Sequence, residues 1–313
     1  YAARVTMLTL AALVLCAAPT GDASPAGYET VVSVTRSNAS PMDSPVPTGW
    51  VSEGALNERQ PESLARAVSR VPGVFTQQRN PTLVVPSIRG LAGRRVRILL
   101  DGVPILPVKT MGAMGYFVSV ADLARLEVLR GPASVLYGSG ALGGVVNAVS
   151  REPLERLGWH GAYGLALGTN NRAVHHRARV SWTRELTGGH RLSAAVSGRV
   201  RDAASYRAGG GETVPTSYYH DRNLGWRLGW QHRAHRLTLV GQHFFGRATG
   251  RAGFADDDAK GRRVSFPRDD NHRVALTYGA RNLRPWLPRL HAALYTQWTD
   301  RADRVRFYTA GFG

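Results

Sequence analysis

The stretch that decides the fold runs from Leu126 to Val149 and reads LEVLRGPASVLYGSGALGGVVNAV. An apolar run ends at Gly131-Pro132, glycines follow at short intervals, and a β-branched run begins at Val145. Glycine and proline mark turns, whereas β-branched residues favour strands. The stretch therefore predicts two strands joined by a tight, glycine-rich connection.

A nucleotide-binding pattern lies inside this connection, because residues 138–143 (GSGALG) fit G-x-G-x-x-G. A dinucleotide site needs a helix directly after the glycines, whose N-terminus receives the pyrophosphate. The residues that follow, Gly144 to Val149, have strand composition, and no βαβ unit surrounds them. The glycines are therefore interpreted as turn residues, and a nucleotide-dependent enzyme is not expected.

The residues upstream of this stretch predict a small α+β domain. Gln60-Pro61-Glu62 opens a helix, predicted over 61–71, whose apolar residues recur at helical spacing until Pro72-Gly73 ends it. Residues 83–88 and 95–100 have strand composition, and the second of these runs closes on the turn dipeptide Asp101-Gly102.

The N-terminal residues have the features of an export signal. Arg4 precedes an apolar run from Val5 to Ala18, which is too short to cross a bilayer as a helix. Gly21-Asp22-Ala23 supplies the small residues that a signal peptidase requires, so cleavage is predicted after Ala23. The only cysteine, Cys16, lies in this leader, and no cysteine chemistry is expected in the mature chain.

Charge divides the chain into two regions. Residues 1–153 carry 14 basic and 10 acidic side chains (net +4), and residues 154–313 carry 26 and 12 (net +14), which together give the +18 of the whole chain. A positive field of this size suits nucleic acid, anionic lipid or an acidic ligand, and alone it selects none of them. Since the sequence opens with Tyr1 and stops at Gly313 without a terminating signal, we expect a fragment.

The second region alternates apolar and polar residues with a period of two. Outer-membrane barrels require this pattern, because one face meets lipid and the other a polar lumen. Connections alternate between tight (187–190, 233–235) and long (202–221, 248–270), as they do in such barrels, and a connection of moderate length is expected at 282–289. A soluble β-sandwich would also alternate, but its loops need not keep this order. Seven strands are expected, centred on residues 163–167, 178–182, 191–201, 224–231, 237–239, 274–278 and 290–294.

Three segments resemble the plug domain of TonB-dependent receptors: Val85–Gly90 (VPSIRG), Arg97–Val103 (RILLDGV) and Leu126–Val149. They occur in the family's order and with about its spacing, and the helix at 61–71 fits the same domain. The resemblance implies an α+β plug followed by antiparallel transmembrane β-barrel strands, about seven of an expected ~22. The implied plug-motif residues are Arg89, Gly90, Asp101, Gly102, Glu127, Arg130, Gly131, Pro132, Tyr137, Gly138, Gly140, Gly143, Gly144 and Asn147.

Roles follow for several of these residues. The charges of Arg89, Glu127 and Arg130 are expected to face polar barrel walls, and the glycines to allow turns. An isolated β-prone run, Glu29-Thr30-Val31-Val32-Ser33-Val34, resembles the TonB box, which such receptors lend by strand addition to a periplasmic energy-coupling protein. The expected domains are a signal peptide (1–23), a linker (24–55), a plug (56–153) and an incomplete barrel (154–313).

The family's function would be active uptake across the outer membrane of a Gram-negative bacterium. The resemblance implies as cargo a ferric siderophore or other metal chelate, with haem or cobalamin also possible. Neither catalysis nor a cofactor is expected, and outer-membrane lipid is an expected partner, whereas nucleic acid is not. A basic, polyanion-binding β protein without transport remains the alternative. Cargo contacts are expected at Gln77, Gln78, Arg79, Lys109, Met111, Met114, Tyr116, Phe117 and His220.

No metal site is expected from the histidines or from the acidic run. His175 and His176 are adjacent, so on a strand they face opposite sides and cannot bind one ion together. The acidic run Asp256-Asp257-Asp258, with Asp269 and Asp270, lacks the spacing of a calcium loop and is interpreted as solvated.

Overall fold

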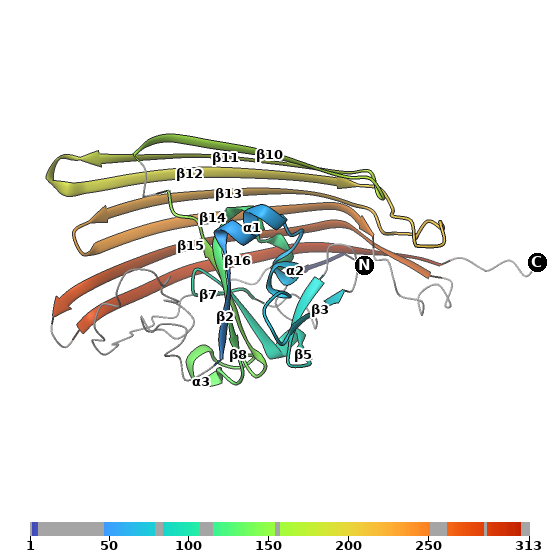
Figure 1. Cartoon of the computed structure of the whole chain (residues 1–313), viewed down its shortest axis with the longest axis horizontal. Coiled ribbons are helices and arrows are strands. Elements are labelled where there is room, and N and C mark those ends of the chain that lie inside the picture. Colours follow the sequence, from blue (N-terminus) through green and yellow to red (C-terminus); the bar gives the residue numbers. More distant parts are fainter. Residues whose placement is uncertain are drawn as a thin grey trace, which may run out of the picture.

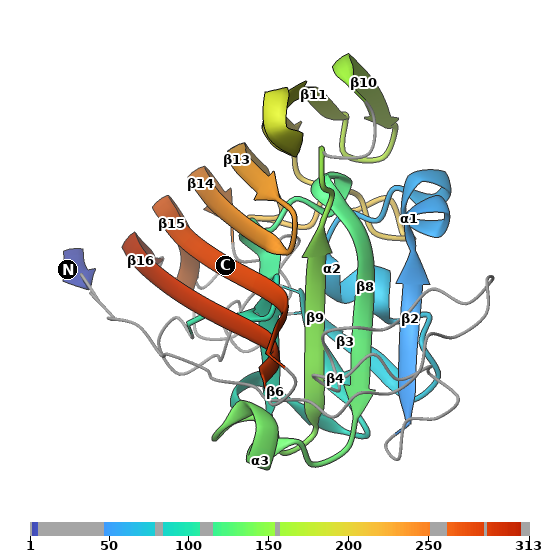
Figure 2. The same cartoon turned by 90° about the vertical axis from the view of Figure 1, so that its left-hand side faces the viewer.

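The computed structural model describes residues 2–5, 47–78, 84–106, 115–153, 157–250, 262–284 and 287–307. These residues form a small α+β domain, which lies against one face of a long antiparallel sheet (Figure 1). Viewed from one end, the long strands form an arc beside and above the domain (Figure 2). The described residues of 47–153 form the domain, and those of 157–307 form the long sheet together with the short strand at 2–5.

The α+β domain, called the plug below, is built on two small sheets. One has the order β2-β8-β9-β6-β7, with β6 and β9 parallel, and the other has the order β3-β4-β5. Their strands are β2 (Thr48–Ser52), β3 (Val74–Gln78), β4 (Val84–Ile88), β5 (Leu91–Ala92), β6 (Val96–Leu100), β7 (Val103–Pro104), β8 (Leu123–Arg130) and β9 (Gly144–Ser150).

Short helices cover these sheets, and two of them begin at serine caps. The Ser52 hydroxyl accepts from Ala55 N and the Ser63 hydroxyl from Arg66 N, each at 3.3 Å, which satisfies a free backbone donor in the first turn. The helices are α1 (Glu53–Arg59), α2 (Leu64–Val68) and α3 (Ser134–Tyr137), with 3-10 turns η1 (Gly93–Arg95), η3 (Gly115–Phe117) and η4 (Val120–Asp122).

The predicted helix over 61–71 is therefore too long. Gln60 adopts a left-handed conformation (φ 44°) at the end of α1, and Ser63 caps the next helix, so only residues 64–68 remain helical. The sequence did not predict α1. The apolar spacing itself was read correctly, because Leu64 and Val68 are buried in the main core with strand residues such as Ile98 and Val146.

Glycine 144 illustrates why the connection after β8 needs glycine. Its φ is +149°, and a Cβ atom there would lie 2.2 Å from the Leu129 carbonyl oxygen. Strand β9 begins at this residue, and no helix follows the glycines. The turn interpretation is thus confirmed, and the helix that a dinucleotide site requires is absent from this described segment.

The long sheet contains the seven strands predicted for the second region, and the short strand β1 (Ala2–Val5) pairs with the last of them. Neighbouring strands along the chain are antiparallel neighbours in the sheet. The seven are β10 (Gly158–Gly168), β11 (Ala173–Leu186), β12 (His190–Ala203), β13 (Tyr219–His232), β14 (His235–Gly250), β15 (Arg262–Arg284) and β16 (Leu287–Phe307).

The period-two alternation sorts these strands into two chemically different faces. The outer face exposes apolar side chains, for example Val180 and Leu228, which are about half exposed. The inner face, toward the plug, buries polar ones, including Arg201 and Arg227. This is the reverse of a soluble sheet, whose buried face is apolar, and it matches the pattern predicted for a barrel wall.

Two connections differ in length from the prediction. Strands β14 and β15 extend into the loop expected at 248–270, as far as Gly250 and from Arg262, and they pair there with Arg247 opposite Arg268. Likewise β15 and β16 nearly meet at Arg284 and Leu287 instead of leaving a loop over 282–289. These extensions carry charges on both faces, so the apolar phase that marks a strand is missing from them.

Several predictions fall outside the described residues. These are most of the export signal, the strand at 29–34, the acidic run at 256–258, and Arg79, Lys109, Met111 and Met114. Among the described residues, no helix is long and apolar enough to span a membrane.

Candidate functional site

The candidate site is the contact between the plug and the inner face of the long sheet. At most of these contacts the sheet supplies donors, namely arginine, asparagine and serine side chains. The plug supplies mainly acceptors, namely carboxylates and backbone carbonyl oxygens. The excess of arginine in the second region therefore has a structural partner in the first.

Asp101 is the centre of one contact. It lies in the turn after β6 with a φ of 51°, next to Gly102, and its carboxylate accepts from Ser150 N and Oγ, both at 2.8 Å. The same carboxylate accepts from Arg227 Nη2 of β13 at 2.7 Å. One aspartate thus closes the turn inside the plug and connects it to the sheet.

A buried polar network lies directly behind this turn. Gly102 N donates to Asn147 Oδ1 at 3.0 Å, and Asn147 Nδ2 donates to Glu127 Oε2 at 3.1 Å. Arg125 Nε donates to Glu127 Oε1 at 2.8 Å. Since Glu127 and Asn147 have no exposed surface, their hydrogen bonds replace the water that burial removes.

A second contact joins the plug to β12 and β13. Ser197 Oγ donates to Asp122 Oδ2 at 2.8 Å, and Asn223 Nδ2 donates to the Phe117 carbonyl oxygen at 2.6 Å. Arg179 of β11 lies 3.9 Å from the Asp122 carboxylate. Both plug residues belong to 3-10 turns. Asp122 accepts through its side-chain carboxylate, and Phe117 accepts through its backbone carbonyl oxygen.

A third contact involves the last two strands. Arg273 of β15 donates to the carbonyl oxygens of Val103 and Pro104 at 3.1 and 3.3 Å, and Gln297 of β16 accepts from Leu106 N at 3.1 Å. These bonds satisfy the backbone of the plug edge strand β7, which would otherwise be an open sheet edge.

The inner face also holds buried ion pairs of its own. Arg201 forms two hydrogen bonds to Asp221 at 2.9 and 2.6 Å and donates a third to the Glu62 carbonyl oxygen at 2.9 Å. Arg301 bonds Asp269 in the same two-pronged way, at 3.0 and 2.5 Å. Apolar packing contributes at one place, where Phe244, Val264 and Phe266 join the plug core.

Two of the three charges that were expected to face the barrel wall bond within the plug instead. Glu127 binds Arg125 and Asn147, and Arg130 donates to the carbonyl oxygens of Pro72 and Thr48. That expectation was wrong for these two, because β8 is an interior strand whose residue 127 lies opposite residue 147 of β9. Arg89 is exposed at the turn after β4, with a φ of 49°.

The remaining motif residues lie at turns or in the plug core. Gly90 and Gly102 have positive φ values at turns, and Gly131, Gly138 and Gly140 have them in the connection between β8 and β9. Pro132 and Gly143 lie in the same connection, and the Tyr137 side chain is buried there in a small cluster with Leu99 and Leu129. The sequence did not indicate Asp122, Arg227 and Asn223 as candidate site residues, although Arg227 and Asn223 lie in the polar phase of their strand.

The predicted cargo residues do not form one cluster among those that the structure describes. Gln77 and Gln78 are exposed on β3, and Gln78 accepts from Arg66 Nη2 at 3.1 Å. Phe117 is only 2% exposed and belongs to the core, and Tyr116 lies beside it in η3. His220 faces outward, because strand alternation turns its neighbours Tyr219 and Asp221 inward. On the outer face its Nδ1 lies 2.8 Å from the Asp202 carboxylate.

His175 and His176 lie on opposite faces of the sheet, as strand alternation predicts. His175 Nε2 bonds the Tyr219 hydroxyl at 2.9 Å on the inner face, whereas His176 Nδ1 bonds the Tyr163 hydroxyl at 2.7 Å on the outer face. In the described part of the chain, no group of three or more His, Cys, Asp or Glu side chains is arranged to hold a metal ion.

Comparison with known proteins agrees with this architecture. Residues 40–145 match the family described as TonB-dependent Receptor Plug Domain. The chain is 34% identical over 151 residues to the ferric enterobactin receptor PirA of Pseudomonas aeruginosa, which covers 44% of this chain and 18% of that protein. It is 32% identical over 167 residues to the ferrioxamine B receptor of Salmonella typhimurium, covering 52% of this chain and 23% of that protein.

Among solved structures, the fold is similar to that of the copper transporter OprC. The TM-score is 0.68 at 23% identity, over 81% of this chain and 37% of that one. The matches span only 18% and 23% of the length of the two curated receptors.

Proposed function

We propose that this chain, which by family is a TonB-dependent receptor with a plug and the first strands of a barrel, takes part in the active uptake of a metal chelate. It would act in the outer membrane of a Gram-negative bacterium. Cargo would bind on the extracellular side, and a periplasmic energy-coupling protein would then pull on the strand at 29–34 by strand addition.

The observation that carries the proposal is the chemistry of the contact between plug and sheet. Asp101, Asp122 and several backbone carbonyl oxygens of the plug meet arginine, serine and asparagine side chains of the sheet. Water can replace hydrogen bonds of this kind at a modest net cost of ~0.5–1.5 kcal/mol each. A plug held in this way can shift inside a rigid wall without exposing a large apolar surface.

The cargo class rests on charge and on the relatives. The inner face buries Arg199 with two side-chain nitrogens that have no partner among the described residues, beside the paired Arg201. Such a wall attracts anions along the route past the plug. The two curated relatives are named as receptors for ferric enterobactin and ferrioxamine B. We therefore favour an anionic ferric siderophore over haem or cobalamin.

The test begins with the completed reading frame, expressed in cells that lack their own siderophore receptors. A heat-modifiable protein in purified outer membranes, and uptake of radiolabelled ferric siderophore that requires the energy-coupling protein, are the expected results. A periplasmic, soluble product would contradict the proposal and favour the alternative of a basic, polyanion-binding β protein. Insertion without uptake of any chelate would contradict the cargo class.

A further inference from the structure

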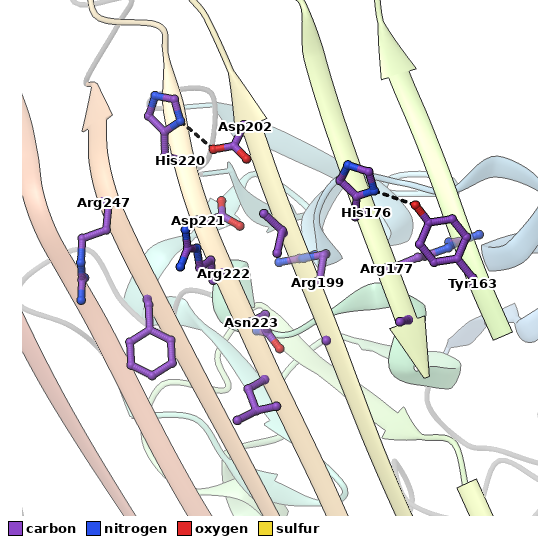
Figure 3. Close-up of a pocket in the computed structure, with 15 residues that line it drawn as sticks. Tyr163, His176, Arg177, Arg199, Asp202, His220, Asp221, Arg222, Asn223 and Arg247 are labelled. Atoms are coloured by element: carbon purple, nitrogen blue, oxygen red, sulfur yellow. Dashed lines mark hydrogen bonds and ion pairs between the residues drawn. The ribbon is translucent and has the colours of Figure 1, made fainter. Parts of the chain in front are cut away.

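The outer face of the long sheet contains a hollow that faces away from the plug. It lies between β10 and β14, near the end where the long connections are, and has a volume of about 740 Å³ (Figure 3). Tyr163, His176, Phe245 and Arg247 form its sides. In Figure 3 the plug lies behind the sheet, so this hollow, called the outer hollow below, is separate from the lumen.

Small residues on adjacent strands create the outer hollow. The strand register places Ala178 opposite Gly198, and Gly198 opposite Leu224. A Cβ atom at Gly198 would meet nothing within 4 Å, so the floor at this glycine is open space. The rings of Tyr163 and Phe245 lie on either side of this floor, and Tyr163 is 67% exposed.

The floor continues into an apolar strip toward the tight turns. In the next two rows of the register, the outward residues include Val180, Val196 and Leu228, with exposed fractions of 49%, 53% and 50%. Exposed apolar residues in a continuous strip on a barrel wall suit acyl chains. A chain that enters the outer hollow can therefore extend along this strip.

The other side of the outer hollow is charged. Arg247 is paired with Asp270, with Nη2 at 3.2 Å, and His220 with Asp202 at 2.8 Å. Arg222, between Val200 and Phe245 in the register, has no side-chain hydrogen bond or ion pair within the described part of the chain. A free guanidinium therefore lies where the apolar strip ends.

We propose that the outer hollow binds an outer-leaflet lipid whose headgroup carries phosphate, with Arg222 as the phosphate ligand and an acyl chain over Gly198 and Ala178. Guanidinium matches phosphate oxygens with two parallel hydrogen bonds, and the flanking rings suit the boundary between headgroup and acyl region. The inference rests on the proposed function only in placing this face against the outer membrane.

The experiment uses the full-length receptor, purified in non-ionic detergent and stripped of lipid. Native mass spectrometry measures the binding of bisphosphorylated lipid A and of the same lipid after removal of its phosphates. The variants are Arg222→Gln, Gly198→Leu to fill the floor, and Arg184→Gln. Arg184 is the matched control, because it is an exposed, outward-facing arginine at the other end of β11.

We expect Arg222→Gln to weaken binding of the phosphorylated lipid about tenfold, as loss of one charge-assisted contact predicts. Gly198→Leu should weaken both lipids, and Arg184→Gln should bind like the wild type. Heat modifiability shows that each variant is folded. Equal losses in Arg222→Gln and Arg184→Gln, equal binding of the two lipids by the wild type, or a dimer formed through this face would overturn the proposal.

Uptake measured on the same variants separates this inference from the proposed function. Arg222→Gln should transport cargo normally, because its side chain points away from the lumen. If the wild type fails to transport while the lipid results hold, the proposed function fails and the lipid site stands.

Discussion

The plug and the long sheet bury opposite kinds of residue. In the plug, the main core is apolar, and the fully buried polar side chains of Glu127 and Asn147 bond to each other. In the sheet, Arg201, Arg227 and Arg273 are buried on the inner face while valine and leucine are exposed on the outer face. One chain therefore buries apolar residues in the region that folds in water, and it exposes them in the region whose outer face meets lipid. Substitutions matched between the regions test it.

The largest contrast is expected between two glycines. A Cβ atom at Gly144 would lie 2.2 Å from the Leu129 carbonyl oxygen, whereas one at Gly198 meets nothing within 4 Å. Gly144→Ala should destabilise the plug by about 3 kcal/mol or more, and Gly198→Ala should change stability by less than about 0.5 kcal/mol. Pulse proteolysis of the plug in increasing urea, on the complete receptor, measures both. Similar values for the two variants would refute the packing described for the β8–β9 connection.

A smaller contrast is expected between two glutamates. Glu127→Ala leaves Arg125 and Asn147 without their acceptor in a buried site and should cost roughly 2–3 kcal/mol. Glu185 on the sheet is half exposed and lies 3.6 Å from Arg191, so Glu185→Ala should have an effect below about 0.5 kcal/mol. The same urea series, followed by plug cleavage and by loss of heat modifiability, distinguishes them. A mild Glu127→Ala phenotype would show that the network is not needed for plug stability.

The smallest effect is expected across the contact itself. The Asp101 side chain is 24% exposed, so a double-mutant cycle with Asp101→Asn and Arg227→Gln should give a coupling energy of about 1 kcal/mol. The readout is the rate at which protease cleaves the plug within an intact barrel. Additive effects of the two substitutions would show that the Asp101–Arg227 ion pair does not hold the plug to the sheet.

Period-two alternation was enough to predict all seven long strands and the two faces of their central residues, because a lipid-facing strand leaves no freedom in that pattern. The extensions of β14 and β15 were missed because charged residues on both faces hide the alternation. Helix α1 was missed because its sequence, EGALNER, has only one buried residue, Leu56.

The contacts of the candidate site were harder to predict than the strands. Glu127 meets Asn147 only through the β8–β9 register, and Asp101 meets Arg227 across 126 residues of sequence. No local sequence pattern predicts either contact. The direction of His220 was predictable in principle, because it alternates with the inward residues Tyr219 and Asp221.

The proposed uptake depends on energy coupling through the predicted strand at 29–34, and a substitution in this strand tests it most directly. Val32→Pro removes a backbone donor and should prevent pairing of that strand with the energy-coupling protein, and it changes no residue of the plug or of the sheet described above. The measurement is uptake and surface binding of radiolabelled ferric siderophore by cells expressing the complete receptor. The account predicts normal binding with uptake abolished in Val32→Pro, whereas normal uptake by this variant would contradict it.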